Sequence, residues 1–166
     1  PERFEFAHPL LGTGEILHDL PSGEDPEQFV LAPDDRHLYI ANEDDAITTV
    51  VDTETRQVVA QIDVGVEPEG MAISPDGKWL AYVSRVGGGF KLQVMDLATG
   101  TVNSVTDTTA DESPSFAPNS RLIVYATIQG GREALMTTTL DGKIKARLAG
   151  ASGDIREPDW GPFQKH

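Results

Sequence analysis

The segment Pro68-Glu69-Gly70-Met71-Ala72-Ile73-Ser74-Pro75-Asp76-Gly77 decides the fold of this chain, because its pattern returns along the sequence. Related segments run from Pro26 to Asp35, from Pro114 to Ser120 and from Pro158 to Pro162. The second proline of each lies at position 33, 75, 118 or 162, so the spacings are 42, 43 and 44 residues. Such a period is typical of solenoids and propellers.

A short apolar stretch rich in β-branched and aromatic residues follows each of the first three turns, which indicates a buried strand. These stretches are 36–42, 78–84 and 121–127. Third strands are predicted at 47–52, 91–96 and 134–140, and fourth strands at 57–64, 102–106 and 143–148. Apolar residues nowhere keep helical spacing over the length of a helix. Four short antiparallel strands per repeat predict an all-β protein, a β-propeller with four-stranded antiparallel blades.

The same pattern divides the chain, which we interpret as one propeller domain over residues 1–166. It comprises a half-blade at 1–25, blades at 26–67, 68–112 and 113–157, and a closing strand at 158–166. In this interpretation 3–8 and 14–20 are the third and fourth strands of a blade whose first strand is 157–163. Pairing of the two ends would close a ring of about four blades and remove exposed edges. A two-fold homodimer that forms a larger ring is the alternative to this monomer.

Composition restricts the possible partners. The chain has 13 Lys and Arg against 27 Asp and Glu, a formal net charge of −14. Nucleic-acid binding and docking on anionic membranes both depend on basic residues, so neither is expected. The longest apolar runs are strand-sized, so no membrane insertion is expected. The chain has no cysteine, which excludes disulfides, thiolate zinc sites and a cysteine nucleophile.

Acidic residues recur in the loop that leads into the innermost strand of each blade. In a propeller these loops surround one mouth of the central channel, so the repeat predicts a ring of carboxylates. Its candidate members are Glu27, Glu69, Glu112 and Glu157. Converging carboxylates repel one another, and Ca²⁺ or another cation that prefers oxygen ligands would relieve this repulsion. The alternative is that these charges are solvated and serve only solubility.

No catalytic motif is visible in the sequence. The four histidines have no metal-ligand spacing, and no Gly-x-Ser-x-Gly segment supplies a serine nucleophile. We therefore expect a protein that is not an enzyme and that needs no cofactor, apart from the cation considered above.

Two families are suggested by particular stretches of the chain. Residues of about 14–84, with Tyr39-Ile40-Ala41-Asn42, resemble YVTN-type propeller repeats of exported bacterial proteins. Residues of about 87–163 resemble the C-terminal blades of TolB, in the stretches 111–119, 123–132 and 156–160. The change of resemblance near 84–89 is interpreted as the seam of a chimeric or engineered propeller.

The TolB resemblance implies a non-catalytic scaffold or protein-interaction module. Members of that family bind the lipoprotein Pal in the periplasm, so a Pal-like partner and a periplasmic location are the expectations. The residues that would carry partner binding are Glu112, Thr127, Gln129, Arg132 and Arg156. The competing interpretation is a cation or small-ligand binder at the acidic channel mouth.

Overall fold

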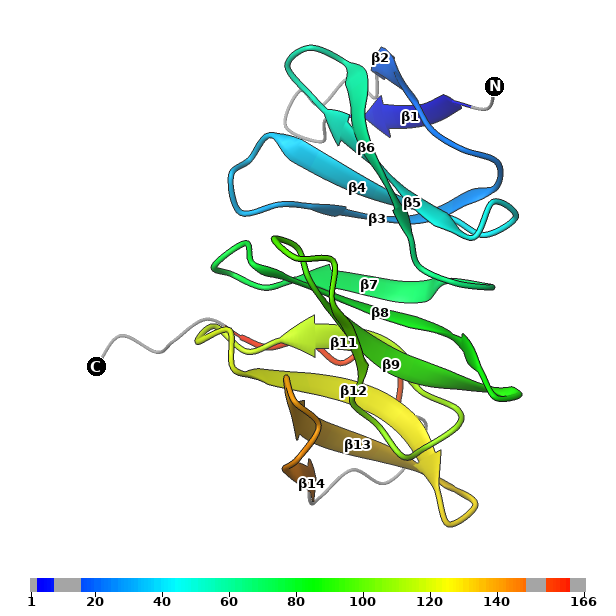
Figure 1. The fold of residues 1–166 in the computed structure, drawn as a ribbon, viewed down its shortest axis with the longest axis vertical. Coiled ribbons are helices and arrows are strands. Elements are labelled where there is room, and N and C mark those ends of the chain that lie inside the picture. Colours follow the sequence, from blue (N-terminus) through cyan, green and yellow to red (C-terminus); the bar gives the residue numbers. More distant parts are fainter. Residues whose placement is uncertain (1–2, 8–15, 149–154, 162–166) are drawn as a thin grey trace.

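The computed structural model describes residues 3–7, 16–148 and 155–161. These residues form strands and loops without a helix, and so contain none that could cross a membrane. Three four-stranded antiparallel sheets follow one another in chain order, which confirms the predicted fold class. They are stacked in Figure 1, with a two-stranded sheet at one end of the stack.

Each four-stranded sheet is a simple up-and-down meander. The first sheet contains β3 (Pro26–Leu31), β4 (His37–Asn42), β5 (Ile47–Asp52) and β6 (Gln57–Asp63). The second contains β7 (Glu69–Ile73), β8 (Trp79–Val86), β9 (Gly89–Asp96) and β10 (Val102–Ser104). The third contains β11 (Glu112–Phe116), β12 (Leu122–Gln129), β13 (Arg132–Thr139) and β14 (Lys145–Arg147). The two-stranded sheet pairs β1 (Arg3–Ala7) with β2 (Ile16–Pro21).

The repeated Pro-Asp or Pro-Asn turn joins the first two strands of each sheet. Its side-chain oxygen accepts a hydrogen bond from the backbone two residues on, at 2.9 Å from Arg36, 3.2 Å from Lys78 and 3.0 Å from Arg121. The next residue has positive φ in all three repeats, at Asp35, Gly77 and Ser120. Asp, Asn and Gly tolerate these conformations better than other residues, which explains why the motif recurs.

An aspartate also closes the hairpin between the third and fourth strands. Asp52 accepts backbone hydrogen bonds from Glu54 at 2.9 Å and Thr55 at 3.1 Å, and Asp96 makes the equivalent pair with Ala98 and Thr99. The Arg36 guanidinium binds the other Asp52 oxygen and holds the pKa of that carboxyl well below its usual range. The turn between β3 and β4 is thereby joined to the turn between β5 and β6.

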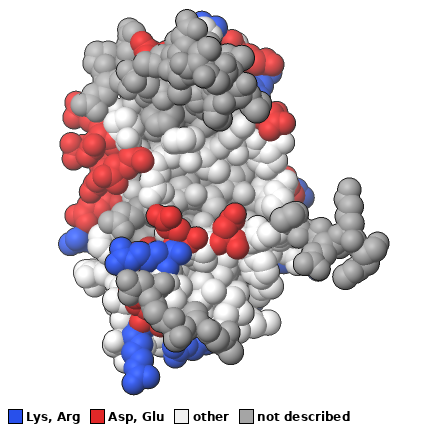
Figure 2. Space-filling model, turned by 180° about the vertical axis from the view of Figure 1, so that it is seen from behind, with Lys and Arg blue, Asp and Glu red and all other residues white. Residues whose placement is uncertain are grey.

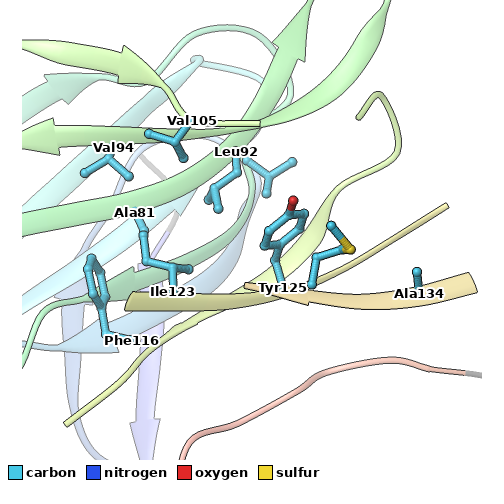
Figure 3. Close-up of a cluster of buried hydrophobic side chains, with 10 residues drawn as sticks. Ala81, Leu92, Val94, Val105, Phe116, Ile123, Tyr125 and Ala134 are labelled. Atoms are coloured by element: carbon cyan, nitrogen blue, oxygen red, sulfur yellow. The ribbon is translucent and has the colours of Figure 1, made fainter. Parts of the chain in front are cut away.

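Neighbouring sheets pack face to face through apolar side chains. Figure 3 shows Ala81, Leu92, Val94 and Val105 of the second sheet and its following loop against Phe116, Ile123 and Tyr125 of the third. A second cluster joins the first and second sheets, and a third joins β2 to the first sheet. In β8, Ala81 and Val83 face one neighbour while Leu80 and Tyr82 face the other, so one strand contributes to two cores.

The described C-terminal segment, 155–161, lies beside the third sheet and away from the β1–β2 sheet, and closure of the ring by pairing of the two chain ends remains a prediction. Ser115 donates to the Asp159 carboxylate at 2.7 Å and accepts from the Trp160 backbone at 3.3 Å, so this segment lies beside β11 (Figure 1). The β1–β2 sheet lies beyond the first sheet, where Leu20 packs on Leu38. The segment thus lies beside β11 in the same way as β11 lies beside β7. Residues 162–166 of the expected closing strand lie outside the residues that the structure describes.

A buried carboxylate fixes the start of the third sheet. Asp111 is 1% exposed and accepts hydrogen bonds from the hydroxyl groups of Thr106, Thr108 and Thr127 and from the Leu92 backbone. It therefore joins β9, the loop before β11, and β12. A buried charge is tolerated only where hydrogen bonds replace its hydration, and four donors do so here.

Replacing Asp111 by alanine should leave these donors without an acceptor and lower the free energy of unfolding by about 3 kcal/mol. Asp107→Ala is the control, because Asp107 is exposed and forms a surface ion pair with Lys145; the expected cost is below about 1 kcal/mol. Urea denaturation measures both. Equal destabilisation by the two variants would show that the buried network is unimportant.

Candidate functional site

An open groove runs along the innermost strands of the three sheets. It has a volume of about 900 Å³ and is lined by β3, β7, β11 and the C-terminal segment at 157–159. Innermost strands of a propeller surround its axis, so this groove is the described part of the axial channel. The groove contains both predicted channel residues and residues that sequence reasoning missed.

Close approach of the innermost strands depends on Gly70. A Cβ at this position would lie 2.9 Å from the Pro114 ring and 3.0 Å from the Ser113 backbone nitrogen, so no larger residue fits without movement of β11. Gly70 also has a φ of 62° at a bulge in β7, and Ser113 has a φ of 50° at a bulge in β11. These bulges turn the start of each innermost strand toward the groove.

The lining of the groove combines polar and apolar side chains. Phe29 of β3, Met71 and Ile73 of β7, and Pro114 and Phe116 of β11 all line it. Phe29 is 52% exposed, which is unusual for a phenylalanine in a strand. Exposed aromatic surface in a rigid groove is typical of a site for a partner.

Acidic side chains lie at the beginning of this groove. Carboxylate oxygens of Asp25, Glu27 and Glu43 all lie within 4.8 Å of one another, a grouping that could hold a cation. The hydrogen bond and the repulsion between Glu27 and Glu43 raise the pKa of Glu43 above its ordinary value. Figure 2 shows that acidic residues gather along one side of the face seen there.

The four residues of the predicted carboxylate ring have different surroundings. Glu27 and Glu157 line the groove, whereas Glu112 is half-buried, pairs with Ala126 and does not line it. For Glu69 the structure describes the backbone, which pairs with Val83. Cation binding by these four residues remains a prediction.

Asp25 and Glu43 were missed as possible cation ligands. They meet because the loop before β3 lies against the β4–β5 hairpin, where the Glu43 backbone donates to the Asp25 carbonyl at 3.1 Å. The Glu24 backbone also donates to the Asp45 carboxylate, at 2.8 Å. The available signal was the acidic run 43–45, which immediately follows a predicted strand.

The predicted partner residues occupy different environments in the third sheet. Thr127 is 4% exposed and donates to Asp111 at 2.7 Å, so its hydroxyl is used inside the protein. Gln129 and Arg132 are exposed and pair with each other across the β12–β13 hairpin. Arg156 is also exposed, and it follows Ile155, whose backbone nitrogen donates a hydrogen bond to the Glu133 carboxylate. Partner binding by these residues and by Glu112 remains a prediction.

Comparison with known proteins covers most of the chain. The family model "TolB beta propeller domain" matches residues 32–164. The Tol-Pal system protein TolB of Polaromonas sp. (strain JS666 / ATCC BAA-500) is 85% identical over 68 residues, which are 41% of this chain and 16% of that protein. The chain thus spans about a sixth of that relative's length.

Solved structures extend the similarity. The crystal structure of TolB from Acinetobacter baumannii aligns with a TM-score of 0.74 and 32% identity, covering 90% of this chain and 38% of that one. A putative TolB from Agrobacterium tumefaciens aligns with a TM-score of 0.72 at 18% identity, covering 87% and 52%, which supports the fold alone.

The family match includes every strand of the three four-stranded sheets except β3. It also includes most of the region in which YVTN-type repeats were predicted. The YVTN resemblance and a chimeric origin remain predictions. By its repeat, its meander sheets and this match, the chain belongs to the TolB beta propeller domain family.

Proposed function

We propose that this chain is a non-catalytic protein-interaction module that binds a Pal-like envelope protein in the axial groove. The observation that carries the proposal is the exposed aromatic side chain of Phe29, which is 52% exposed and lines the groove beside further apolar side chains. The curated relatives are named as Tol-Pal system proteins, which supports a partner of this kind and a periplasmic location. Rigid strands present the apolar groups, so the surface is preorganised for binding.

The form of the groove suits a protein segment. It is open along its length, and its walls come from backbone-paired strands that do not need to move. An extended segment of the partner would cover Phe29 and the neighbouring Met71, while the acidic side chains at 25, 27 and 43 would favour basic residues at one end of the segment. Exposed Gln129 and Arg132 are proposed as further contacts at the edge of the third sheet.

We also propose that the chain combines YVTN-like and TolB-like parts. Curated TolB relatives that are 81–86% identical match only 39–41% of the chain, which supports a difference in origin between the two parts. This proposal concerns ancestry, and the groove includes residues from both parts.

Phe29→Ala should weaken binding of purified Pal at least about tenfold, because it removes the largest exposed apolar group in the groove. Val59→Ala is the matched control, since Val59 is similarly exposed, at 51%, but lies on β6 outside the groove. Calorimetric titration of each variant with Pal measures the dissociation constant. No heat with the unchanged chain, or equal loss in both variants, would contradict the proposal.

A second candidate function is cation binding by Asp25, Glu27 and Glu43, which the raised pKa of Glu43 favours. A divalent cation would relieve the repulsion that raises this pKa. This function would occupy the mouth of the same groove, where a bound cation would also reduce the negative charge that a partner meets.

Millimolar calcium should raise the melting temperature of the unchanged chain at pH 7, and Glu27→Gln should abolish that increase. A raised folded pKa means that stability is highest below the unfolded pKa and falls as pH rises through the folded value. Without calcium, the Glu27→Gln variant should therefore have a higher melting temperature than the unchanged chain at pH 7. At pH 3 the two melting temperatures should be equal. Glu24→Gln, on the same loop outside the cluster, is the control. Absence of a calcium shift at pH 7 would exclude the site.

A further inference from the structure

The strand β6 forms the outer edge of the first sheet, where it pairs with β5 on one side only. It is seven residues long, whereas the outer strands of the other two four-stranded sheets, β10 and β14, have three residues each. The strand β14 also contains two basic residues, Lys145 and Arg147. Short or charged edge strands discourage pairing with another chain, so β6 lacks the protection that β10 and β14 have.

The surface of β6 is apolar for an exposed strand. Six of its seven residues are exposed, and no charged residue occurs between 57 and 62. Val58 is 43% exposed and Val59 is 51% exposed. β-branched residues favour strands, so this edge has the composition of a strand that pairs on both sides. An exposed edge of this kind is a template for a further strand.

The backbone groups of three residues in β6 point away from β5. The Val64 nitrogen donates to the Ala46 carbonyl at 3.2 Å, so residues 46 and 64 form a hydrogen-bonded pair. Hydrogen-bonded and non-hydrogen-bonded pairs alternate in an antiparallel ladder, so the pairs at 47, 49 and 51 of β5 are non-hydrogen-bonded. Their partners in β6 are Asp63, Gln61 and Val58. The step of three residues from Gln61 to Val58 reflects the bulge in this part of the ladder.

A second copy of the chain fits this edge in an antiparallel register centred between residues 59 and 60. Val58 then lies opposite Gln61 of the second copy, and a two-fold axis repeats the pair with the roles exchanged. Both residues direct their backbone groups to the open edge, so each of the two pairs can exchange two hydrogen bonds. The first sheets of the two copies would thereby join into one continuous sheet, with Val59 at its centre.

Charged residues at the ends of β6 complement one another in this register. Arg56, directly before the strand, lies opposite Asp63 of the second copy, and the two-fold axis makes the same pair at the other end. Both residues are exposed. Registers shifted by one or two residues would place Arg56 opposite an uncharged residue, at 61, 62, 64 or 65. Opposite charges directly across a ladder stabilise it, so the charges select the register that the backbone groups also allow.

We propose that the chain forms a two-fold homodimer by antiparallel pairing of its β6 edge with the β6 edge of a second copy. This interface differs from the larger ring considered from the sequence, because it uses the outer edge of a blade. It also lies away from the axial groove, to which β6 contributes no residue.

Sedimentation equilibrium of the full chain tests the dimer over about a hundredfold range of concentration, in about 0.15 M salt, which screens repulsion between the two acidic chains. The mass should rise from 17.9 kDa toward twice that value with concentration. Arg56→Glu should weaken the dimer about tenfold, because like charges then lie opposite one another at both ends. Adding Asp63→Lys to this variant restores opposite charges and should restore the dimer. Arg121→Glu, on an exposed turn of the third sheet, is the control for net charge.

Gln61→Pro tests the backbone pairing separately. Proline removes an N–H that points to the open edge, so the hydrogen bonds to β5 should be kept while the dimer is lost. Overlapping melting curves with the unchanged chain ensure that the fold is preserved.

A monomer at every concentration would overturn the proposal, as would a dimer that persists in the Gln61→Pro variant or is weakened equally by Arg56→Glu and Arg121→Glu. The test is independent of Pal binding, because Phe29→Ala should leave the dimer unchanged.

Discussion

Face-to-face packing between neighbouring sheets is the interaction on which the rest of this structure depends. A four-stranded sheet has two faces, and the central strands of the second sheet are buried on both of them. Leu80 and Ala81, adjacent in β8, are each 0% exposed although they face different neighbours. Each blade is thus stable only beside another, as expected for a repeat whose units cannot bury their apolar faces alone. Asp111 adds a polar connection across the same interface between the second and third sheets.

The same packing produces the axial groove. The innermost strands approach closely at Gly70 and Pro114, and their exposed side chains together form the axial groove. Rigid strands position the interacting groups, while loops such as that of Glu43 supply charge.

The local parts of the fold could be predicted from the sequence. The stretches 36–42 and 121–127 were expected to be central strands, and β4 and β12 begin within one residue of them. The turns were also accessible, because Asp34 and Asn119 act on neighbours two residues away. Long-range pairings were less accessible: Glu43 meets Asp25 only through the docking of a loop on a hairpin, and the burial of Thr127 depends on Asp111. The position of residues 157–161 beside β11, by contrast, agrees with the repeat, in which Pro158 begins the fourth copy.

Hydrogen–deuterium exchange with and without purified Pal tests most directly whether the axial groove is the interaction surface. Binding of Pal in the axial groove should slow exchange in the innermost strands, at 26–31, 69–73 and 112–116, with no change in the outer strand at 57–63. These segments belong to one chain under identical conditions, so the outer strand serves as an internal reference. Slower exchange confined to 57–63, or no change anywhere, would contradict binding in the axial groove.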